Sequence, residues 1–534
     1  MIRSETARSR RSRLSDLTSR ADGLFVSPWR VFLTSFTLLF AFMAIWSLAT
    51  PLFASPDEPA HVARAVSLVR GGELLGHSIR GANPAYTEVT IPALYAEGPT
   101  YAGCYAFKDT VPASCNPALT APDHNVVTRT YVGRYPPLYY AIVGLPSLFT
   151  VSTAGLYLMR IMSDLLGAIY LALAVMSVTA WSKNRLLFLG LIVAVTPMTV
   201  FLSSVVNPSG LEITAATCLW CSALILVTER SSDPPTGLVA VVVAAATGLM
   251  LVRGLSPLWV ALIVIVVACV AGRRALVSIS RSRAVRLSLL ILVPTTLFAV
   301  VWIVAARALD LLPLGIPVGR DETRAHLLAS IIGDTGFWIQ QMIGLFGWLD
   351  TYSPLLTYLI WYAALSLFAL LALVCYQRLR DLAALVLLIL IVLIVPILIT
   401  YEQAHHVGID WQGRYILPMA VGIPLLSAVM VGRSDLLHNV QARLALVVCA
   451  LVGIGQIGAF AQTLRRYAVG LAGPLDYLHG SWRPPLGAGL LTAGAVIAMA
   501  LLMAFVYRLF MVQGVGIAGP TRAHDREDLL ATQI

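Results

Sequence analysis

Long apolar runs recur along the whole chain and are separated by short polar segments. As a helix, a run of about 20 apolar residues crosses about 30 Å of hydrocarbon. By this criterion we predict twelve membrane spans, at 31–50, 156–180, 186–206, 211–228, 237–252, 256–271, 287–306, 354–375, 382–400, 414–431, 444–461 and 487–510. The apolar segment 136–149 is too short to span, which favours a helix lying along the membrane surface.

The composition agrees with this pattern. Hydrophobic residues make up 58% of the chain and charged residues only 12%, against about 45–50% and about 25% in soluble domains. Soluble, fibrous and disordered proteins are excluded, and an all-α polytopic membrane protein is predicted. The 37 Lys and Arg against 27 Asp and Glu give a net charge of +10, which in such a protein indicates topology and contact with membrane lipids rather than nucleic acid.

The basic residues predict the topology. Seven arginines precede the first span, and an excess of Lys and Arg marks the cytoplasmic side. If 136–149 does not cross, the basic connectors all fall on that side, namely Lys183, Arg185, Arg230, Arg273, Arg274, Arg281, Arg283, Arg286, Arg378, Arg380, Arg433 and Arg443. We therefore expect a cytoplasmic tail at 1–30, a transmembrane domain at 31–510 and a cytoplasmic tail at 511–534. The large loops 51–155 and 307–353 are then extracytoplasmic.

The cysteines fall into two groups. Five lie within predicted spans, where they act as small apolar residues. Cys104 and Cys115 instead lie in the first outer loop among Gly, Pro and Asn, in a compartment that is oxidising. We expect these two to form a disulfide, with two free thiols as the alternative.

The strongest chemical signal directly follows the first span, where the chain reads Ser-Pro-Asp-Glu-Pro-Ala-His from Ser55 to His61. One interpretation is structural, because Ser55 with Glu58 fits a capping box at a helix start. The other is functional, because Asp57, His61 and Arg64 have the i, i+4, i+7 spacing that places side chains on one helical face. Ionisable groups at membrane depth are functional candidates by default.

Four further motifs lie along the chain. The sequence carries Tyr135-Pro-Pro-Leu-Tyr-Tyr140, Asn207-Pro208, Gly347-Trp-Leu-Asp350 and Gln412-Gly-Arg-Tyr-Ile-Leu-Pro418. Together with the segment around Asp57, these motifs resemble a bacterial membrane family named domain of unknown function 2142. That family resembles the GT-C superfamily of polyprenyl-phosphate-sugar-dependent glycosyltransferases.

The resemblance implies roles for particular residues. GT-C enzymes place an acidic general base just after the first span, which matches Asp57, with Glu58 as its neighbour. They also place interfacial helices between the first two spans, which fits 56–71 and 136–149. Ser209 is a departure, because an acidic residue is expected there in this family.

The chemistry of the superfamily needs a base, cations near the departing phosphate and an apolar groove for the lipid, but no nucleotide or redox cofactor. Arg414 is the leading phosphate candidate, because it lies where a span meets the outer surface and a guanidinium binds two phosphate oxygens at once; a snorkelling arginine is the alternative. Further candidates for contact with the substrates are His61, Arg64, Arg160, Arg320, Arg324, Gln412 and Tyr415. A helix-end anchor is the alternative for Arg160, and solvated side chains for Arg320 and Arg324.

Two outer segments support weaker hypotheses. Trp348 and Asp350 are candidates for an acceptor site, because aromatic faces stack on sugars; an interfacial tryptophan is the alternative. His405 and His406, counted among the substrate-contacting candidates, offer metal ligands together with Glu402 and Asp410. Their spacing matches no standard zinc motif, so we assign no metal, with a divalent ion at these residues as the alternative.

The sequence thus predicts a GT-C-like glycosyltransferase that moves a sugar from a polyprenyl-phosphate donor to a cell-envelope glycan or glycolipid, on the outer face of the bacterial cytoplasmic membrane. The Arg-rich, Lys-poor composition suggests a high-GC bacterium such as an actinobacterium, where arabinofuranose or mannose on decaprenyl phosphate is the analogous donor.

Two other classes of protein are also compatible with twelve spans. A transporter or flippase predicts inverted repeats and charges near the midplane, and a non-catalytic envelope-assembly partner leaves the Asp57 cluster unexplained beyond capping.

Overall fold

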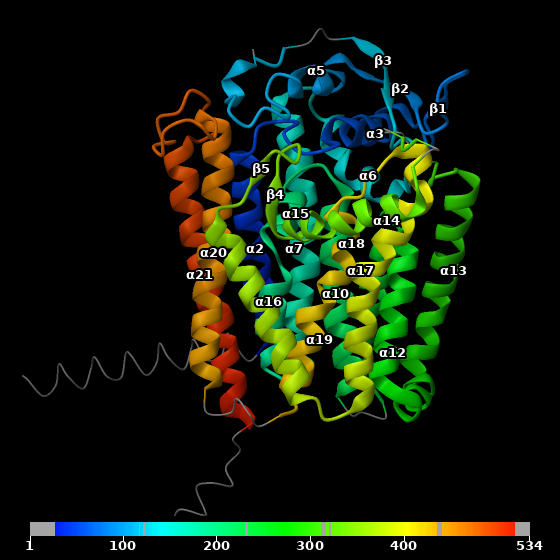
Figure 1. The fold of residues 1–534 in the computed structure, drawn as a ribbon, viewed down its shortest axis with the longest axis vertical. Coiled ribbons are helices and arrows are strands. Elements are labelled where there is room, and N and C mark those ends of the chain that lie inside the picture. Colours follow the sequence, from blue (N-terminus) through cyan, green and yellow to red (C-terminus); the bar gives the residue numbers. More distant parts are fainter. Residues whose placement is uncertain are drawn as a thin grey trace, which may run out of the picture.

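The computed structural model describes residues 27–116, 118–120, 124–229, 233–310, 317–319, 322–434 and 440–517. Long, roughly parallel helices form a bundle, and short helices with a small sheet cover one end of it (Figure 1). The predicted all-α polytopic class is confirmed.

The described residues contain ten helices that are long and apolar enough to cross a membrane. They are α2 (Pro28–Ala49), α7 (Thr153–Trp181), α10 (Pro208–Thr228), α12 (Ser256–Ser280), α13 (Arg283–Ala305), α16 (Leu355–Cys375), α17 (Leu379–Val407), α18 with α19 (Gly413–Ala420 and Gly422–Val431), α20 (Gln441–Val469) and α21 (Ala488–Ile517). Each corresponds to a predicted span.

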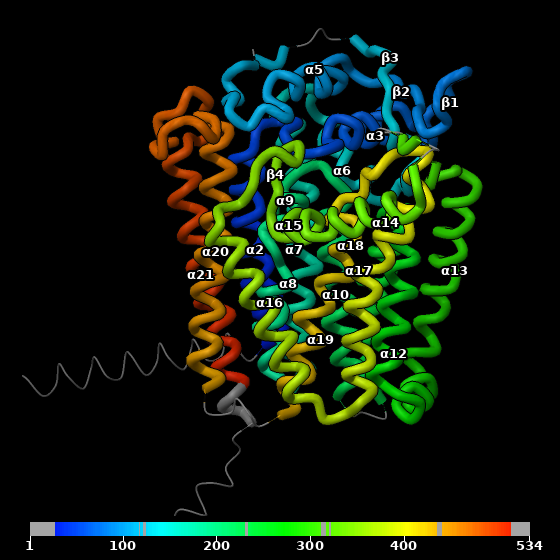
Figure 2. The backbone as a smooth tube through the Cα atoms, viewed as in Figure 1, coloured from blue at the N-terminus to red at the C-terminus, as the bar shows by residue number. Residues whose placement is uncertain are grey.

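The other two predicted spans are helical but irregular. The span expected at 186–206 is broken into α8 (Leu186–Ala194) and α9 (Pro197–Ser203), which meet at 62° (Figure 2). Pro197 cannot continue a helix, and Thr196 caps the new one by accepting from the Thr199 amide. The span expected at 237–252 is α11 (Thr236–Met250), a helix of only 15 residues.

The helices differ in how far the protein encloses them. α10 is buried along nearly its whole length, whereas α13 leaves most of its apolar side chains exposed. Apolar side chains on the outside of a bundle are favourable only against lipid, so α10 is the centre of the bundle and α13 faces the membrane.

We call residues 51–152 and 322–354 the cap. Its helices are α3 (Glu58–Gly71), α4 (Ala93–Ala96), α5 (Gly98–Ala102), α6 (Pro137–Val143), α14 (Arg324–Gly333) and α15 (Thr335–Gly344), with short 3-10 turns at Ala113–Cys115 and Leu145–Leu148. Its strands are β1 (His77–Ser78), β2 (Thr87–Pro92) and β3 (Asn125–Thr130) in one antiparallel sheet, and β4 (Leu345–Phe346) with β5 (Thr351–Tyr352) in another. The segments predicted as interfacial, 56–71 and 136–149, form α3 and α6 and do not span.

The arrangement agrees with the predicted alternation of sides. The described parts of the segments expected outside lie together at the capped end, and the described Arg-rich connectors lie at the opposite end (Figure 1). Arg230 lies outside the described residues. Cys104 and Cys115 form the predicted disulfide within the cap, with their Cα atoms 6.1 Å apart. That the capped end faces outward stays a prediction from the arginines.

Candidate functional site

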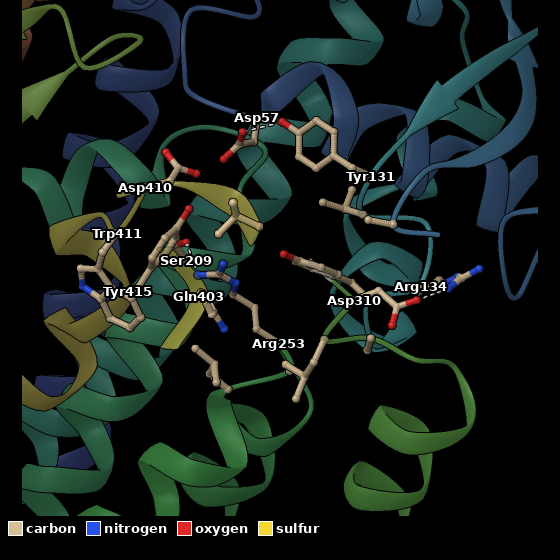
Figure 3. Close-up of a pocket in the computed structure, with 18 of the residues that line it drawn as sticks. Asp57, Tyr131, Arg134, Ser209, Arg253, Asp310, Gln403, Asp410, Trp411 and Tyr415 are labelled. Carbon is tan, nitrogen blue, oxygen red and sulfur yellow. Dashed lines mark hydrogen bonds and ion pairs between the residues drawn. The ribbon is translucent and has the colours of Figure 1, made fainter. Parts of the chain in front are cut away.

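A cavity of about 340 Å³ lies where the cap meets the bundle (Figure 3). Its walls come from segments far apart in the chain: the start of α3, the loop after β3, the starts of α10 and α12, the end of α13, and the α17–α18 connection. Its polar lining includes Asp57, His61, Tyr131, Arg134, Ser209, Arg253, Arg307, Asp310, Gln403, Asp410, Trp411, Arg414 and Tyr415. Figure 3 shows Asp57 and Asp410 at the same end of the cavity.

The backbone at the start of α3 turns the Asp57 carboxylate toward this cavity. Asp57 has a left-handed φ of 65° and makes no side-chain capping bond. The Ser55 hydroxyl donates to the Pro56 carbonyl, so the capping box considered for Ser55 and Glu58 does not form. The Asp57 carboxylate instead accepts hydrogen bonds from the Tyr131 hydroxyl and from Arg414 Nη2. The Asp57 side chain therefore contacts residues of the cavity rather than the helix terminus.

Arg414 is the cation closest to Asp57. It is 4% exposed, pairs with the Asp57 carboxylate and lies 5.2 Å from the Tyr415 ring centroid. Its Nε and Nη1 groups are buried and have no hydrogen-bond partner among the described residues. Buried charged donors without a partner are unfavourable, so the geometry suits an anionic group beside Arg414.

The surroundings set the charge of three groups at the cavity. Burial alone would raise the pKa of Asp57, but the charge of Arg414, with His61 and the Tyr131 hydrogen bond, outweighs burial and holds the pKa below its ordinary value. Burial lowers the pKa of His61 to about 3, so His61 is neutral at physiological pH. Burial and the Asp57 charge raise the pKa of Asp410 to about 6.

Arg253 is a second cation at the cavity, and it was not among the residues predicted from the sequence. It lies in the turn between α11 and α12, donating through Nη1 to the Ser209 hydroxyl at 3.1 Å and to Glu212 Oε2 at 3.3 Å. Its guanidinium lies 4.9 Å from the Tyr415 ring centroid. The sequence did carry a signal for Arg253, because it is an arginine in a turn predicted to lie outside, where the positive-inside bias disfavours basic residues.

Ser209, the departure from the family pattern, therefore contacts a cavity arginine. The carboxylate that pairs with Arg253 comes from Glu212, one helical turn further along α10, which also accepts from the Ser256 hydroxyl at 2.7 Å. An acidic side chain at position 209 would place a further negative charge beside Arg253. With a hydroxyl there, more of the Arg253 charge is left for a bound anion.

Glu58 and Arg160, expected near the chemistry, form a buried pair with each other. Arg160 Nε and Nη2 donate to the two Glu58 carboxylate oxygens, both at 2.7 Å, and the side chains are 0% and 2% exposed. Arg160 also donates to the carbonyls of Ser47, Thr50 and Pro51. Neither residue lines the cavity, so the structure gives the pair a structural position between α2, α3 and α7.

The other predicted residues are spread over the capped end. Arg64 donates to the carbonyls of Glu73 and Leu74, which anchors the end of α3 and keeps its guanidinium out of the cavity. Arg324, His405 and His406 are exposed and do not line it. Arg320 lies outside the described residues. The described part of the chain holds no group of three or more His, Cys, Asp or Glu side chains that could bind a metal ion.

A second cavity, of about 450 Å³, lies on the cap side of Asp57. It shares Asp57, Tyr131 and Asp410 with the first cavity. Trp348 and Gln412, both predicted for the substrate site, line this second cavity. The Asp57 carboxylate therefore stands in a wall common to two cavities.

Residues 40–423 match the family described as "Predicted membrane protein (DUF2142)". The chain belongs to this family. In this DUF2142 protein the matched range holds every residue that lines either cavity, from Pro56 to Tyr415, and ends before α20 and α21.

Comparison with curated proteins found no match for this DUF2142 protein. Among solved structures it is similar to ArnT from Cupriavidus metallidurans bound to undecaprenyl phosphate, with a TM-score of 0.44 and 13% identity over 90% of this chain and 76% of that one. The apo form of the same protein is similar with a TM-score of 0.38, at the same identity and coverage.

Proposed function

We propose that this protein is a GT-C-type membrane glycosyltransferase that moves a sugar from a polyprenyl-phosphate donor to a cell-envelope glycan or glycolipid acceptor, on the outer face of the cytoplasmic membrane. The observation that supports this proposal best is the position of Asp57. It is a carboxylate paired with a buried arginine, in a wall shared by two cavities. This arrangement suits a transferase, because the acceptor hydroxyl must lie between the base and the donor and attack from the side opposite the departing phosphate.

The first cavity suits the donor. Arg414 and Arg253 supply positive charge for the phosphate, and planar guanidinium groups bind phosphate oxygens well. The same cavity has an apolar wall made by Leu255, Leu309, Ile399 and Val407, beside helices whose outer faces meet lipid. A prenyl chain can lie along that wall while its phosphate reaches the arginines.

In the proposed reaction, the acceptor hydroxyl oxygen attacks the anomeric carbon from the side opposite the phosphate. The new C–O bond forms as the bond to the phosphate oxygen breaks, and the configuration inverts. Asp57 takes the proton of the attacking hydroxyl, which is general-base catalysis. The bond electrons leave with the phosphate, whose growing negative charge is stabilised by Arg414 and Arg253.

The ion pair between Asp57 and Arg414 links donor binding to this step. Arg414 lowers the pKa of Asp57, and a carboxylate with a low pKa is a weak base. A donor phosphate at Arg414 competes with Asp57 for the same guanidinium. Donor binding therefore weakens that interaction and raises the proton affinity of Asp57 at the moment when a base is needed.

The proposal is tested with full-length protein in lipid nanodiscs, incubated with a radiolabelled polyprenyl-phosphate sugar and an envelope glycan fraction. Label in the glycan together with free polyprenyl phosphate supports transfer. The same protein is reconstituted in vesicles, where unchanged donor that crosses the bilayer identifies a flippase or transporter and contradicts the proposal. Donor that stays bound but unchanged identifies a non-catalytic binding protein and contradicts it as well.

A further inference from the structure

The loop closed by the Cys104–Cys115 disulfide holds one aromatic side chain out of the protein. Phe107 is 72% exposed, and its backbone adopts a left-handed φ of 61°. Both features are unfavourable for phenylalanine, because an apolar ring is left in water and a non-glycine residue is strained in this region. Strain that the surrounding structure maintains is a pointer to function.

The surroundings maintain this conformation firmly. The Phe107 amide donates to Asp350 Oδ2 at 3.1 Å, and Arg466 Nη2 donates to the same oxygen at 2.9 Å. Arg466 is fully buried and also donates to the carbonyls of Tyr105 and Lys108, on either side of Phe107. Arg466 of α20 therefore holds the loop on both sides of Phe107 and fixes the position of its ring.

Phe107 faces a second fixed ring. The Trp348 ring centroid lies 5.7 Å from that of Phe107, with 59° between the ring planes. The Trp348 Nε1 group donates to the Phe53 carbonyl at 3.1 Å, which holds the indole in place. Both rings line the second cavity, the one that shares Asp57 with the donor cavity.

The lining of the second cavity favours a carbohydrate over a lipid chain. Its walls are residues of the cap and of the α17–α18 connection, beyond the ends of the spans. Polar groups accompany the rings, including Arg129 and Gln412, and Gln412 Oε1 is buried without a partner among the described residues. A sugar presents C–H groups that suit aromatic faces and hydroxyls that suit such polar groups.

We propose that the second cavity binds a carbohydrate ring of the acceptor on Phe107 and Trp348, and presents one of its hydroxyls to Asp57. The acceptor is then a glycan that reaches the site from the aqueous side, and not a lipid that reaches it through the membrane. This inference rests on the proposed function for the role of Asp57, but the binding itself can be measured without any transfer.

The test uses full-length wild-type protein without any donor, so that no transfer can occur, and fluorescently labelled mannan, arabinan and glucan oligosaccharides as probes in anisotropy titrations. We expect saturable binding of at least one probe. Phe107→Ala should weaken it about tenfold, since an aromatic contact of roughly 1.4 kcal/mol corresponds to that factor. Phe149→Ala is the matched control, because Phe149 is 85% exposed and does not line the cavity, and it should leave the affinity unchanged.

The inference is overturned if none of the probes binds saturably, or if Phe107→Ala and Phe149→Ala bind equally well. These outcomes are separate from failure of the proposed function. If the protein transfers sugar from a polyprenyl-phosphate donor, but Phe107→Ala leaves the KM for the acceptor unchanged, the proposed enzymatic function stands and this acceptor site is wrong. If the wild-type protein binds an oligosaccharide through Phe107 but shows no transfer activity, the carbohydrate site stands and the proposed enzymatic function is wrong.

Discussion

Replacing Glu58 by glutamine should destabilise the protein more than the adjacent Asp57→Asn, because the Asp57 side chain is 19% exposed and lines two cavities, whereas Glu58 is 2% exposed and lines neither. Glu58 accepts two charged hydrogen bonds from Arg160 and a third from the Val206 amide at 3.1 Å. The glutamine keeps the volume but brings an NH₂ group against a guanidinium and leaves the buried Arg160 charge unpaired. Breaking a buried ion pair on one side costs about 3–5 kcal/mol, which is a large share of the stability of most domains.

The measurement is the fraction of protein that stays monodisperse on size exclusion after heating in detergent, as a function of temperature. Glu88→Gln is the matched control, because it removes a carboxylate from the exposed Arg129–Glu88 pair, where the expected effect is below about 1 kcal/mol. A Glu58→Gln protein with the heat resistance of the Glu88→Gln protein, but without transfer activity, would refute the structural role of Glu58 and make it a reacting group.

Other expectations follow from the same geometry. Arg414→Lys should weaken donor binding at least tenfold in a titration with polyprenyl phosphate, because an ammonium cannot reproduce the guanidinium contacts; unchanged affinity would contradict the phosphate site. Above pH about 6 the Asp410 carboxyl is charged and raises the proton affinity of Asp57, so transfer kcat/KM should rise through that pH in the wild type and lose this step in Asp410→Asn. For topology, a membrane-impermeant maleimide added to whole cells should label Val127→Cys and not Ser278→Cys; the reverse labelling would invert the predicted sides.

The sequence was sufficient for the ten long apolar helices, because membrane thickness fixes how long an apolar run must be. It wrongly predicted one regular span where Thr196 and Pro197 break the chain into α8 and α9. A proline within an apolar run hardly lowers the mean hydropathy, so the break is not visible in the apolar pattern. The short α3 and α6 were predictable from length and from the polar residues around Asp57. The disulfide was predictable from compartment and loop composition.

The site was predictable only as separate candidates. Asp57 and Arg414 were each singled out by local chemistry, but nothing local indicates that residues 357 positions apart form one ion pair. The adjacent acids Asp57 and Glu58 look equivalent in sequence, and only the left-handed backbone at Asp57 directs one to the cavity and the other to Arg160. Tyr131 gave no signal, because the pairing of β3 with β2 is what brings the loop after it over Asp57.

The central claim is that Asp57 removes the acceptor proton, and its most direct measurement is the rate of sugar transfer by Asp57→Asn protein. The claim predicts a fall of at least about 100-fold, since general-base catalysis typically contributes 10²–10⁴-fold, in protein that stays folded and monodisperse at the assay temperature. Asp476→Asn, the same substitution at an exposed aspartate outside both cavities, should transfer at the wild-type rate. Near-normal transfer by a folded Asp57→Asn protein would contradict the account.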